Sequence, residues 1–213
     1  MTFADRADAG RQLAEKLLKH AYTRPLVLAL PRGGVPVGRE VARALKAPLD
    51  TLVARKIGAP FNPEWAVGAI APHDVVILDD DAMKSASVSR LAVEGTIAAE
   101  RKELTRRINA YRSGSFSAGF IPKTVVVVDD GVATGLTARA ALRAARARYP
   151  KVRLVFAAPV CIGRSEKELA GEADDIVCLT SPAGFYAVGQ AYERFEQVTD
   201  DEVLAYLKTA SKK

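Results

Sequence analysis

The sequence predicts an α/β fold in which a parallel, twisted sheet is flanked by helices. Short apolar runs with the character of buried strands alternate along the chain with longer segments of helical periodicity, and this alternation is typical of parallel sheets. No internal repeat or low-complexity stretch interrupts the pattern. The length of 213 residues, with 49% hydrophobic and 26% charged residues, suits one globular domain that buries a sizeable core.

The expected elements follow from the local patterns in chain order. Apolar runs predict strands at 26–30, 49–54, 124–128, 152–157 and 176–179. Helical spacing predicts helices at 35–46, 87–112, 135–149 and 200–207. In the longest of these helices, one stripe is apolar and the opposite face is charged; the apolar stripe consists of Val93, Ile97, Leu104, Ile108 and Tyr111.

The segment from about 59 to 86 is patterned differently from the rest. Two short strands at 66–71 and 75–78 flank the turn Pro72-His73-Asp74, which indicates a hairpin standing off the main sheet. We expect a single domain over 1–213 with a small hood built from about 59–86 and from 181–213. The Ser- and Gly-rich stretch at 113–122 predicts a loop.

Composition narrows the possible partners and compartments. The formal charge of +6 comes from dispersed arginines rather than a basic run, so nucleic acid is an improbable partner and a polyanionic small ligand explains the excess equally well. No apolar run can span a bilayer and the first ten residues lack a signal-peptide core, so we expect no membrane association and a cytoplasmic protein. Two cysteines, Cys161 and Cys178, are too few for a disulfide scaffold and are expected to be small residues buried on or near strands.

The strongest functional signal follows the run Val125–Val128. A predicted strand delivers Asp129 and Asp130 to its carboxyl end, where ligands bind in open α/β sheets. Small residues and two threonines then lead into a helix whose N-terminus suits a phosphate; they are Ala133, Thr134, Gly135, Leu136 and Thr137. An ordinary strand–turn–helix unit accounts for one aspartate and one capping threonine, but not for the whole set.

This segment resembles the motif of the type I phosphoribosyltransferase family that binds 5-phosphoribosyl-1-diphosphate (PRPP). The resemblance implies that Asp129 and Asp130 hold the ribose hydroxyls and that Ala133, Thr134, Gly135, Leu136 and Thr137 hold the 5-phosphate. It also implies the fold of that family and Mg²⁺ as the cofactor. No metal ligand is assigned directly to a side chain.

A second signal is a glycine turn after the predicted strand at 26–30. Val35 stands where a dinucleotide-binding fingerprint requires glycine, and Arg39-Glu40 stands where a Walker A loop requires Lys-Ser or Lys-Thr. What remains is Arg32 and Gly33, which can offer a guanidinium and backbone N–H groups to a diphosphate. The segment resembles the family's pyrophosphate loop; alone, it could equally be a tight strand–helix turn.

A basic pair, Arg55 and Lys56, is expected at the end of the strand at 49–54. Such a pair is commonly a solvated strand cap. The resemblance implies that it faces the diphosphate and precedes a mobile loop. The run Asp79-Asp80-Asp81 also follows an apolar strand, but no glycine–threonine loop comes after it, so we interpret it as a solvated turn.

A third signal lies near the C-terminus, where Phe185 and Tyr186 precede Ala-Val-Gly. The segment is similar to the hood of the 6-oxopurine phosphoribosyltransferases, which implies that one of the two aromatic rings stacks on the base. Both could equally be core residues. Ala133 stands where the 6-oxopurine enzymes carry an aspartate, so the two segments disagree about the base.

The resemblance covers most of the chain and implies a phosphoribosyltransferase. The enzyme would transfer the 5-phosphoribosyl group of PRPP to a nitrogenous base or related acceptor, with release of pyrophosphate. Its partners would be PRPP and a small-molecule acceptor, with a homodimer expected from the family alone. The alternative is a non-catalytic regulatory protein that senses PRPP or a nucleotide.

Overall fold

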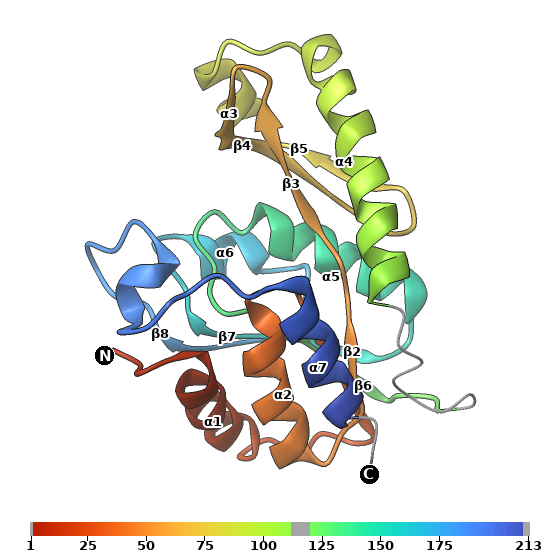
Figure 1. Ribbon diagram of the computed structural model, residues 1–213, viewed down its shortest axis with the longest axis vertical. Helices are drawn as coiled ribbons and strands as arrows, with labels where there is room; N and C mark the ends of the chain where they lie inside the picture. The colour runs from red at the N-terminus through yellow and green to blue at the C-terminus, as the bar shows by residue number, and fades with distance from the viewer. Residues whose placement is uncertain (1, 112–119, 211–213) are drawn as a thin grey trace.

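The computed structural model describes residues 2–111 and 120–210, and a parallel five-stranded sheet forms its centre (Figure 1). The strand order is β2-β1-β6-β7-β8. The bounds are β1 (Pro25–Ala29), β2 (Leu49–Thr51), β6 (Thr124–Val128), β7 (Arg153–Val160) and β8 (Asp175–Thr180). The prediction of a parallel sheet flanked by helices is therefore confirmed.

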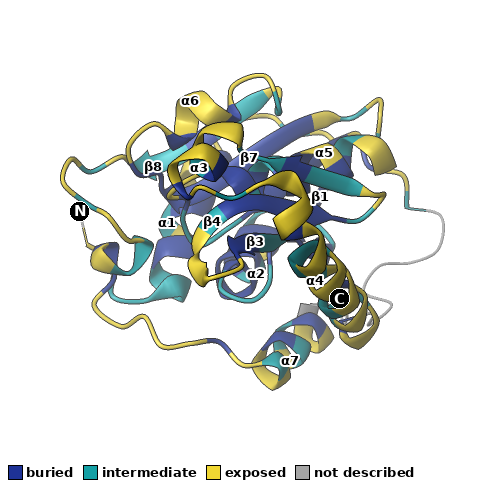
Figure 2. Cartoon of the chain, turned by 90° about the horizontal axis from the view of Figure 1, so that it is seen from above, coloured by how far each residue is buried: buried dark blue, intermediate teal, exposed yellow. Residues whose placement is uncertain are grey.

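The sheet is buried on both faces, as the β-branched composition of β6 predicts. Val126 and Val128 pack on one face among residues of α1 (Arg6–Leu17), α2 (Gly34–Leu45) and α7 (Asp200–Ala210). Val125 and Val127 pack on the other face against α5 (Leu136–Arg148). Successive side chains of a strand point to opposite faces, so one run of valines serves both layers. The buried residues accordingly concentrate at the sheet in Figure 2.

A second, antiparallel sheet stands above α5 in Figure 1. It consists of β3 (Arg55–Ala59), β4 (Asn62–Ala71) and β5 (Val75–Leu78), followed by α3 (Asp80–Ser85) and α4 (Arg90–Ala110). The predicted pair of strands around Pro72-His73-Asp74 is confirmed. Strands β4 and β5 pack on α5, and α4 packs on β3.

Two local features differ from what the sequence predicts, and a third expectation is not tested. The strand expected at 49–54 ends at Thr51, and Arg55 and Lys56 begin β3 of the second sheet instead of ending a strand of the first. Helix α1 was not predicted, because its buried face contains small residues and a weak apolar pattern; that face consists of Ala9, Gly10, Leu13, Ala14 and Leu17. The loop expected at 113–122 lies mostly outside the described residues.

A disulfide joins the two cysteines, which were expected only to be small buried residues; Cys161 is buried, whereas Cys178 is half-buried. Cys161 follows β7, Cys178 lies on the adjacent strand β8, and a disulfide joins them across a Cα–Cα distance of 6.0 Å. Strand pairing thus brings together two thiols 17 positions apart, which their spacing alone did not indicate.

The C-terminal part of the chain returns to the N-terminus. The short helix α6 (Ser165–Leu169) precedes β8, and the 3₁₀ turn η1 (Val188–Ala191) follows it. The Phe3 N–H donates to the carbonyl of Ala191, and the Glu193 N–H donates to the carbonyl of Phe3, both at 2.8 Å. Across the described ranges, no helix has both the length and the apolar character of a membrane span.

Candidate functional site

The two predicted ribose ligands lie at the carboxyl end of β6, in the middle of the main sheet. The Asp130 N–H donates to Oδ1 of Asp129 at 2.9 Å, which turns the first carboxylate back onto the chain. Burial raises the pKa of the Asp129 carboxyl well above its usual value, and the neighbouring charge of Asp130 raises it further. The nearby guanidinium of Arg6 opposes this rise in the Asp129 pKa.

Asp130 has two partners that the sequence did not reveal. Arg6 donates from Nε to Oδ2 of Asp130 at 2.7 Å, and the Tyr192 hydroxyl donates to the Asp130 carbonyl at 2.6 Å. Arg6 is 124 positions away and carries no local signal of this contact. Tyr192 lies in the aromatic segment that the sequence singles out, but only the fold shows where its hydroxyl points.

The predicted phosphate loop is fixed at its start by β7. The Val132 N–H donates to the Val160 carbonyl at 2.9 Å, and the Ile162 N–H donates to the Val132 carbonyl at 2.8 Å. Gly135 then begins α5 with a positive φ of 79°, a conformation that favours glycine. Among the described residues no side chain caps this helix, so its first N–H groups and its positive dipole end are available to an anion.

The predicted pyrophosphate loop packs directly on the ribose pair. A Cβ built on Gly33 would lie 2.0 Å from Oδ2 of Asp130, and one built on Gly34 would lie 2.7 Å from the Val128 carbonyl oxygen. Both positions therefore require glycine. Arg32, which precedes them, reaches Oδ1 of Asp200 at 3.6 Å, on the N-terminal turn of α7.

The basic pair lies in the second sheet and is occupied by carboxylates. Arg55 pairs with Glu100 of α4, with Glu103 at 3.9 Å as a second partner. Lys56 donates from Nζ to Glu64 at 3.0 Å. The two cations line a cavity of about 470 Å³ between β3 and α4. A diphosphate would have to compete with these internal partners.

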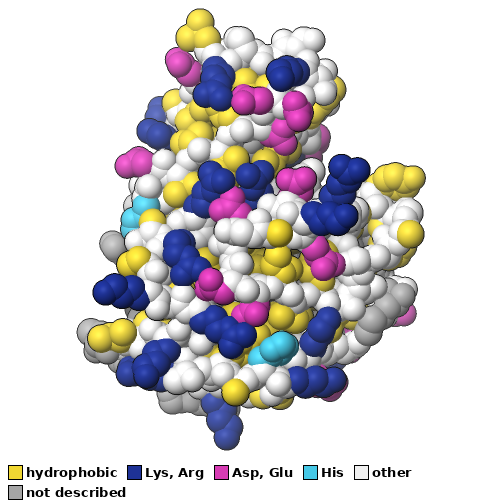
Figure 3. Space-filling model, turned by 180° about the vertical axis from the view of Figure 1, so that it is seen from behind, with side chains coloured by type: hydrophobic (Ala, Val, Ile, Leu, Met, Phe, Trp, Pro, Cys, Tyr) yellow, Lys and Arg dark blue, Asp and Glu magenta, His cyan; other side chains and the backbone are white. Residues whose placement is uncertain are grey.

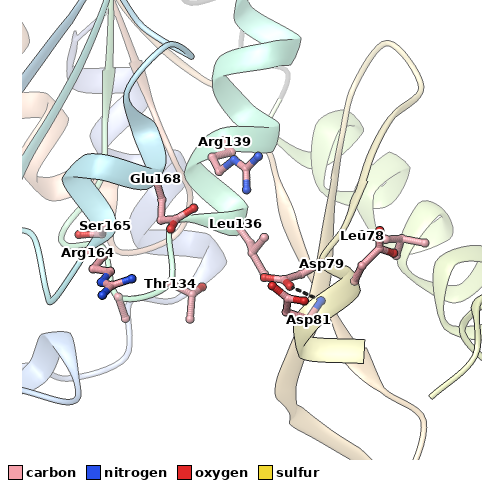
Figure 4. A pocket seen from close by; sticks show the side chains of 11 residues that line it. Leu78, Asp79, Asp81, Thr134, Leu136, Arg139, Arg164, Ser165 and Glu168 are labelled. Atoms are coloured by element: carbon pink, nitrogen blue, oxygen red, sulfur yellow. Dashed lines mark hydrogen bonds between the residues drawn. The ribbon is translucent and has the colours of Figure 1, made fainter. Parts of the chain in front are cut away.

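A cavity of about 480 Å³ opens beside the phosphate loop (Figure 4). Thr134 lies in its wall, with Arg164 and Glu168 nearby on the α6 side. Asp79 and Asp81 lie on the opposite wall, which the second sheet and α3 provide. The loop is thus accessible to a ligand of several atoms, since binding cavities have volumes of about 300–1,000 Å³.

The aspartate run 79–81 is more ordered than the solvated turn that we expected. Asp79 is the N-cap of α3, and its Oδ1 accepts hydrogen bonds from the N–H groups of Asp81 and Ala82 at 3.1 and 2.9 Å. The capping hydrogen bonds explain why an aspartate ends this strand.

The two aromatic residues of which one was predicted to stack on the base lie in different surroundings. Tyr186 is 86% exposed, whereas Phe185 packs against a buried cluster that contains Phe3 and Tyr192. The same C-terminal segment touches the ribose motif, because a Cβ built on Gly131 would lie 2.4 Å from Cγ1 of Val188. Tyr186 is thus the more exposed of the two rings and Phe185 is only partly buried.

The carboxylate oxygens of the two aspartates are of the kind that Mg²⁺ binds. Mg²⁺ binds oxygen and usually keeps phosphate and water ligands. Asp129 and Asp130 supply oxygen atoms, but Oδ2 of Asp130 is already hydrogen-bonded to Arg6. Cys161, Cys178 and Glu166 also lie close together, but the two cysteines form a disulfide and therefore offer no thiolate to a metal ion.

The face of the molecule drawn in Figure 3 has no dominant basic patch. Lys and Arg side chains are interspersed there with Asp and Glu. This distribution agrees with the dispersed arginines of the sequence, and it differs from the concentrated basic stripe typical of nucleic-acid-binding domains.

Comparison with known proteins gives the family. A model of the phosphoribosyl transferase domain matches residues 3–194. The curated protein "Putative phosphoribosyl transferase Rv0571c" of Mycobacterium tuberculosis is 46% identical over 208 residues, which is 98% of this chain but 47% of that protein. The chain therefore spans about half the length of the curated relatives it matches.

Two solved structures are similar to this chain over nearly its whole length. The crystal structure of TT1426 from Thermus thermophilus is 40% identical, with a TM-score of 0.77 and coverage of 97% of this chain and 98% of that one. A hypothetical protein from Neisseria gonorrhoeae with bound ppGpp has a TM-score of 0.52 at 13% identity over 98% and 94% of the two chains, which shows a shared fold alone. With the family model covering residues 3–194, this chain belongs to the phosphoribosyl transferase domain family.

Proposed function

We propose that the chain transfers the 5-phosphoribosyl group of PRPP to a nitrogenous acceptor and releases pyrophosphate. One observation carries the proposal: Asp129 and Asp130 lie at the carboxyl edge of the sheet, and a short loop connects them to the N-terminus of α5, which no described side chain caps. A helix N-terminus favours a phosphate, and adjacent carboxylates favour hydroxyl donors. A ribose phosphate combines both groups.

In this proposal the phosphate loop binds the 5-phosphate through backbone N–H groups and the hydroxyls of Thr134 and Thr137. The ribose hydroxyls donate to Asp129 and Asp130. The Tyr186 ring stacks on the acceptor. Binding at these points orients C1 of the ribose toward the acceptor nitrogen, and such positioning is a large part of catalysis in transfer reactions.

The remaining residues stabilise the leaving group. Arg32, with the N–H of Gly33, donates to the diphosphate, and Arg55 and Lys56 exchange their carboxylate partners for diphosphate oxygens. The C1–O bond breaks with its electron pair moving to the diphosphate, while the acceptor nitrogen forms the new bond to C1 and its N–H proton passes to water. Bound Mg²⁺ supplies further positive charge to the diphosphate oxygens.

A regulatory protein that binds PRPP or a nucleotide without turnover is the second candidate. One observation favours it: all the cations proposed for the diphosphate, Arg32, Arg55 and Lys56, have carboxylate partners within the chain. A binding site that is already neutralised in this way gains less from a diphosphate, because existing ion pairs must first be broken.

Pyrophosphate release distinguishes the two. The purified protein is incubated with PRPP, Mg²⁺ and one of a panel of purine and pyrimidine bases, and pyrophosphate is measured by a coupled assay. We expect release with at least one base and its loss in the double variant Asp129→Asn, Asp130→Asn. Calorimetric binding of PRPP without release for any base supports the regulatory candidate, and unchanged PRPP affinity in the folded double variant contradicts both.

A further inference from the structure

Asp130 lies where four distant segments of the chain meet. Its Oδ2 accepts the hydrogen bond from Arg6 at the start of α1, and its carbonyl accepts that from Tyr192 in the C-terminal segment. Gly33 of the second loop lies so close that any side chain there would overlap Oδ2. The carboxylate of Asp130 is therefore confined by groups other than its own strand.

Arg6 is itself held in place on several sides. Besides its contact with Asp130, it donates from a second guanidinium nitrogen to the Glu196 carbonyl at 2.8 Å. Its guanidinium carbon lies 3.8 Å from the ring centroid of Phe195, in cation–π geometry. Only 12% of the Arg6 side chain is exposed. A planar guanidinium that is fixed in this way loses little conformational freedom when it orients a carboxylate.

The aromatic residues beneath Arg6 connect it to both ends of the chain. Phe195 stacks on Tyr192 with ring centroids 4.9 Å apart, and Tyr192 contacts Phe3 at 5.6 Å. The Tyr192 hydroxyl donates to the backbone carbonyl of Asp130, while Arg6, which lies over Phe195, donates to its side chain. This closed arrangement serves to orient one carboxylate.

We propose that Arg6 is a positioning residue of the ribose site, which fixes Oδ2 of Asp130 and thereby sets the orientation in which this carboxylate meets a hydroxyl of a ribose phosphate. This inference rests on the proposed function, because it assigns the sugar hydroxyls to Asp130. Arg6 acts through the carboxylate and contributes nothing to the phosphate loop at the start of α5. Its removal therefore weakens ligands that carry ribose hydroxyls and spares a bare phosphate.

The test compares three ligands by calorimetry: ribose 5-phosphate, 2,3-dideoxyribose 5-phosphate and inorganic phosphate. We expect Arg6→Ala to lower the affinity for ribose 5-phosphate about tenfold, the scale of one charge-assisted hydrogen bond. The affinities for the dideoxy sugar and for inorganic phosphate stay within about twofold of the wild type. Arg6→Lys, which keeps the charge, recovers part of the loss.

Arg11→Ala is the matched control, because Arg11 lies on the same helix with an exposed side chain that pairs with Asp8. It should leave all three affinities unchanged. Should Arg6→Ala unfold, Arg6→Gln carries the same test, since its stem still covers Phe195. The readout is a ratio of affinities, which a general loss of folding would not change selectively.

Two results overturn the inference. Unchanged affinity for ribose 5-phosphate in folded Arg6→Ala, or an equal loss for all three ligands, shows that Arg6 does not position the ribose acceptor. If the wild type fails to prefer ribose 5-phosphate over the dideoxy sugar, the ribose site fails and the proposed function fails with it. The wild-type measurement thus separates the two failures.

Discussion

Replacing Gly33 by alanine tests the contact between the two loops in a geometry free of backbone strain. Gly33 has φ −62° and ψ −33°, which alanine adopts readily, so any effect comes from the new methyl group. That group would lie 2.0 Å from Oδ2 and 2.6 Å from Cγ of Asp130. Reaching an ordinary contact of about 3.4 Å requires a displacement of roughly 1.4 Å.

A shift of this size separates Asp130 from Arg6, which are 2.7 Å apart. Overpacking of this kind costs about 1–3 kcal/mol in unfolding free energy. We expect Gly33→Ala to lower stability by that amount and the affinity for ribose 5-phosphate by about tenfold, the effect of one lost charge-assisted hydrogen bond. Inorganic phosphate, bound by the loop at α5, should bind as before.

Gly95→Ala is the control, because a Cβ at this exposed position of α4 meets nothing within 4 Å. It should raise stability by up to about 1 kcal/mol through helix propensity and leave binding unchanged. Urea unfolding and calorimetry on both variants give the two quantities. A Gly33→Ala protein with wild-type stability and wild-type ribose 5-phosphate affinity would refute the close packing of the two loops.

Three further outcomes follow from the charges of the site and its surroundings. Asp129→Asn should raise the melting temperature at pH 8, since the raised pKa of this buried carboxyl means that its charged form destabilises the fold. The gain in melting temperature should vanish near pH 4, and a lower melting temperature of the variant at pH 8 would contradict the prediction. Alanine at both Arg55 and Lys56 should weaken PRPP more than ribose 5-phosphate in calorimetry, and equal losses would count against a diphosphate role. The Tyr111 hydroxyl donates to Asp200, and burial raises the pKa of Tyr111 to about 12, so wild-type stability should fall as the pH rises from about 10 towards 12. Tyr111→Phe should reduce that fall in urea titrations at pH 9 and 11.5, and an unchanged fall would exclude Tyr111 as its source.

The parallel sheet and the position of Asp129 and Asp130 at a strand end were predictable because local sequence encodes them. The strand at 124–128 was located to the residue, since five β-branched residues in a row have few alternatives to a buried strand. Asp129, Asp130 and the following loop are contiguous, so their proximity needs no knowledge of the fold. The same reasoning located the hairpin at 66–78 from its turn residues.

The contacts between distant segments were not predictable from local pattern. Arg55 follows an apolar run and therefore looked like a strand end, yet its partner Glu100 is 45 positions away on α4. Helix α1 escaped notice because Gly10 lies close to α2, where a Cβ would come within 2.9 Å of the Val37 carbonyl oxygen, so a small residue replaces the usual apolar one. Arg6 begins that unpredicted helix, so its contact with Asp130 could not be predicted either.

The direct pairing of β1 with β6 makes the second sheet a module. Val27 and Val126 are neighbours in the main sheet although almost a hundred positions separate them, and the chain between β2 and β6 carries β3 to β5 with α3 and α4 as one continuous insertion. The strand pairs of the five-stranded sheet include no residue of the insertion. Evolution can thus exchange or reshape the insertion, together with Arg55 and Lys56, while the strand that presents Asp129 and Asp130 stays in place.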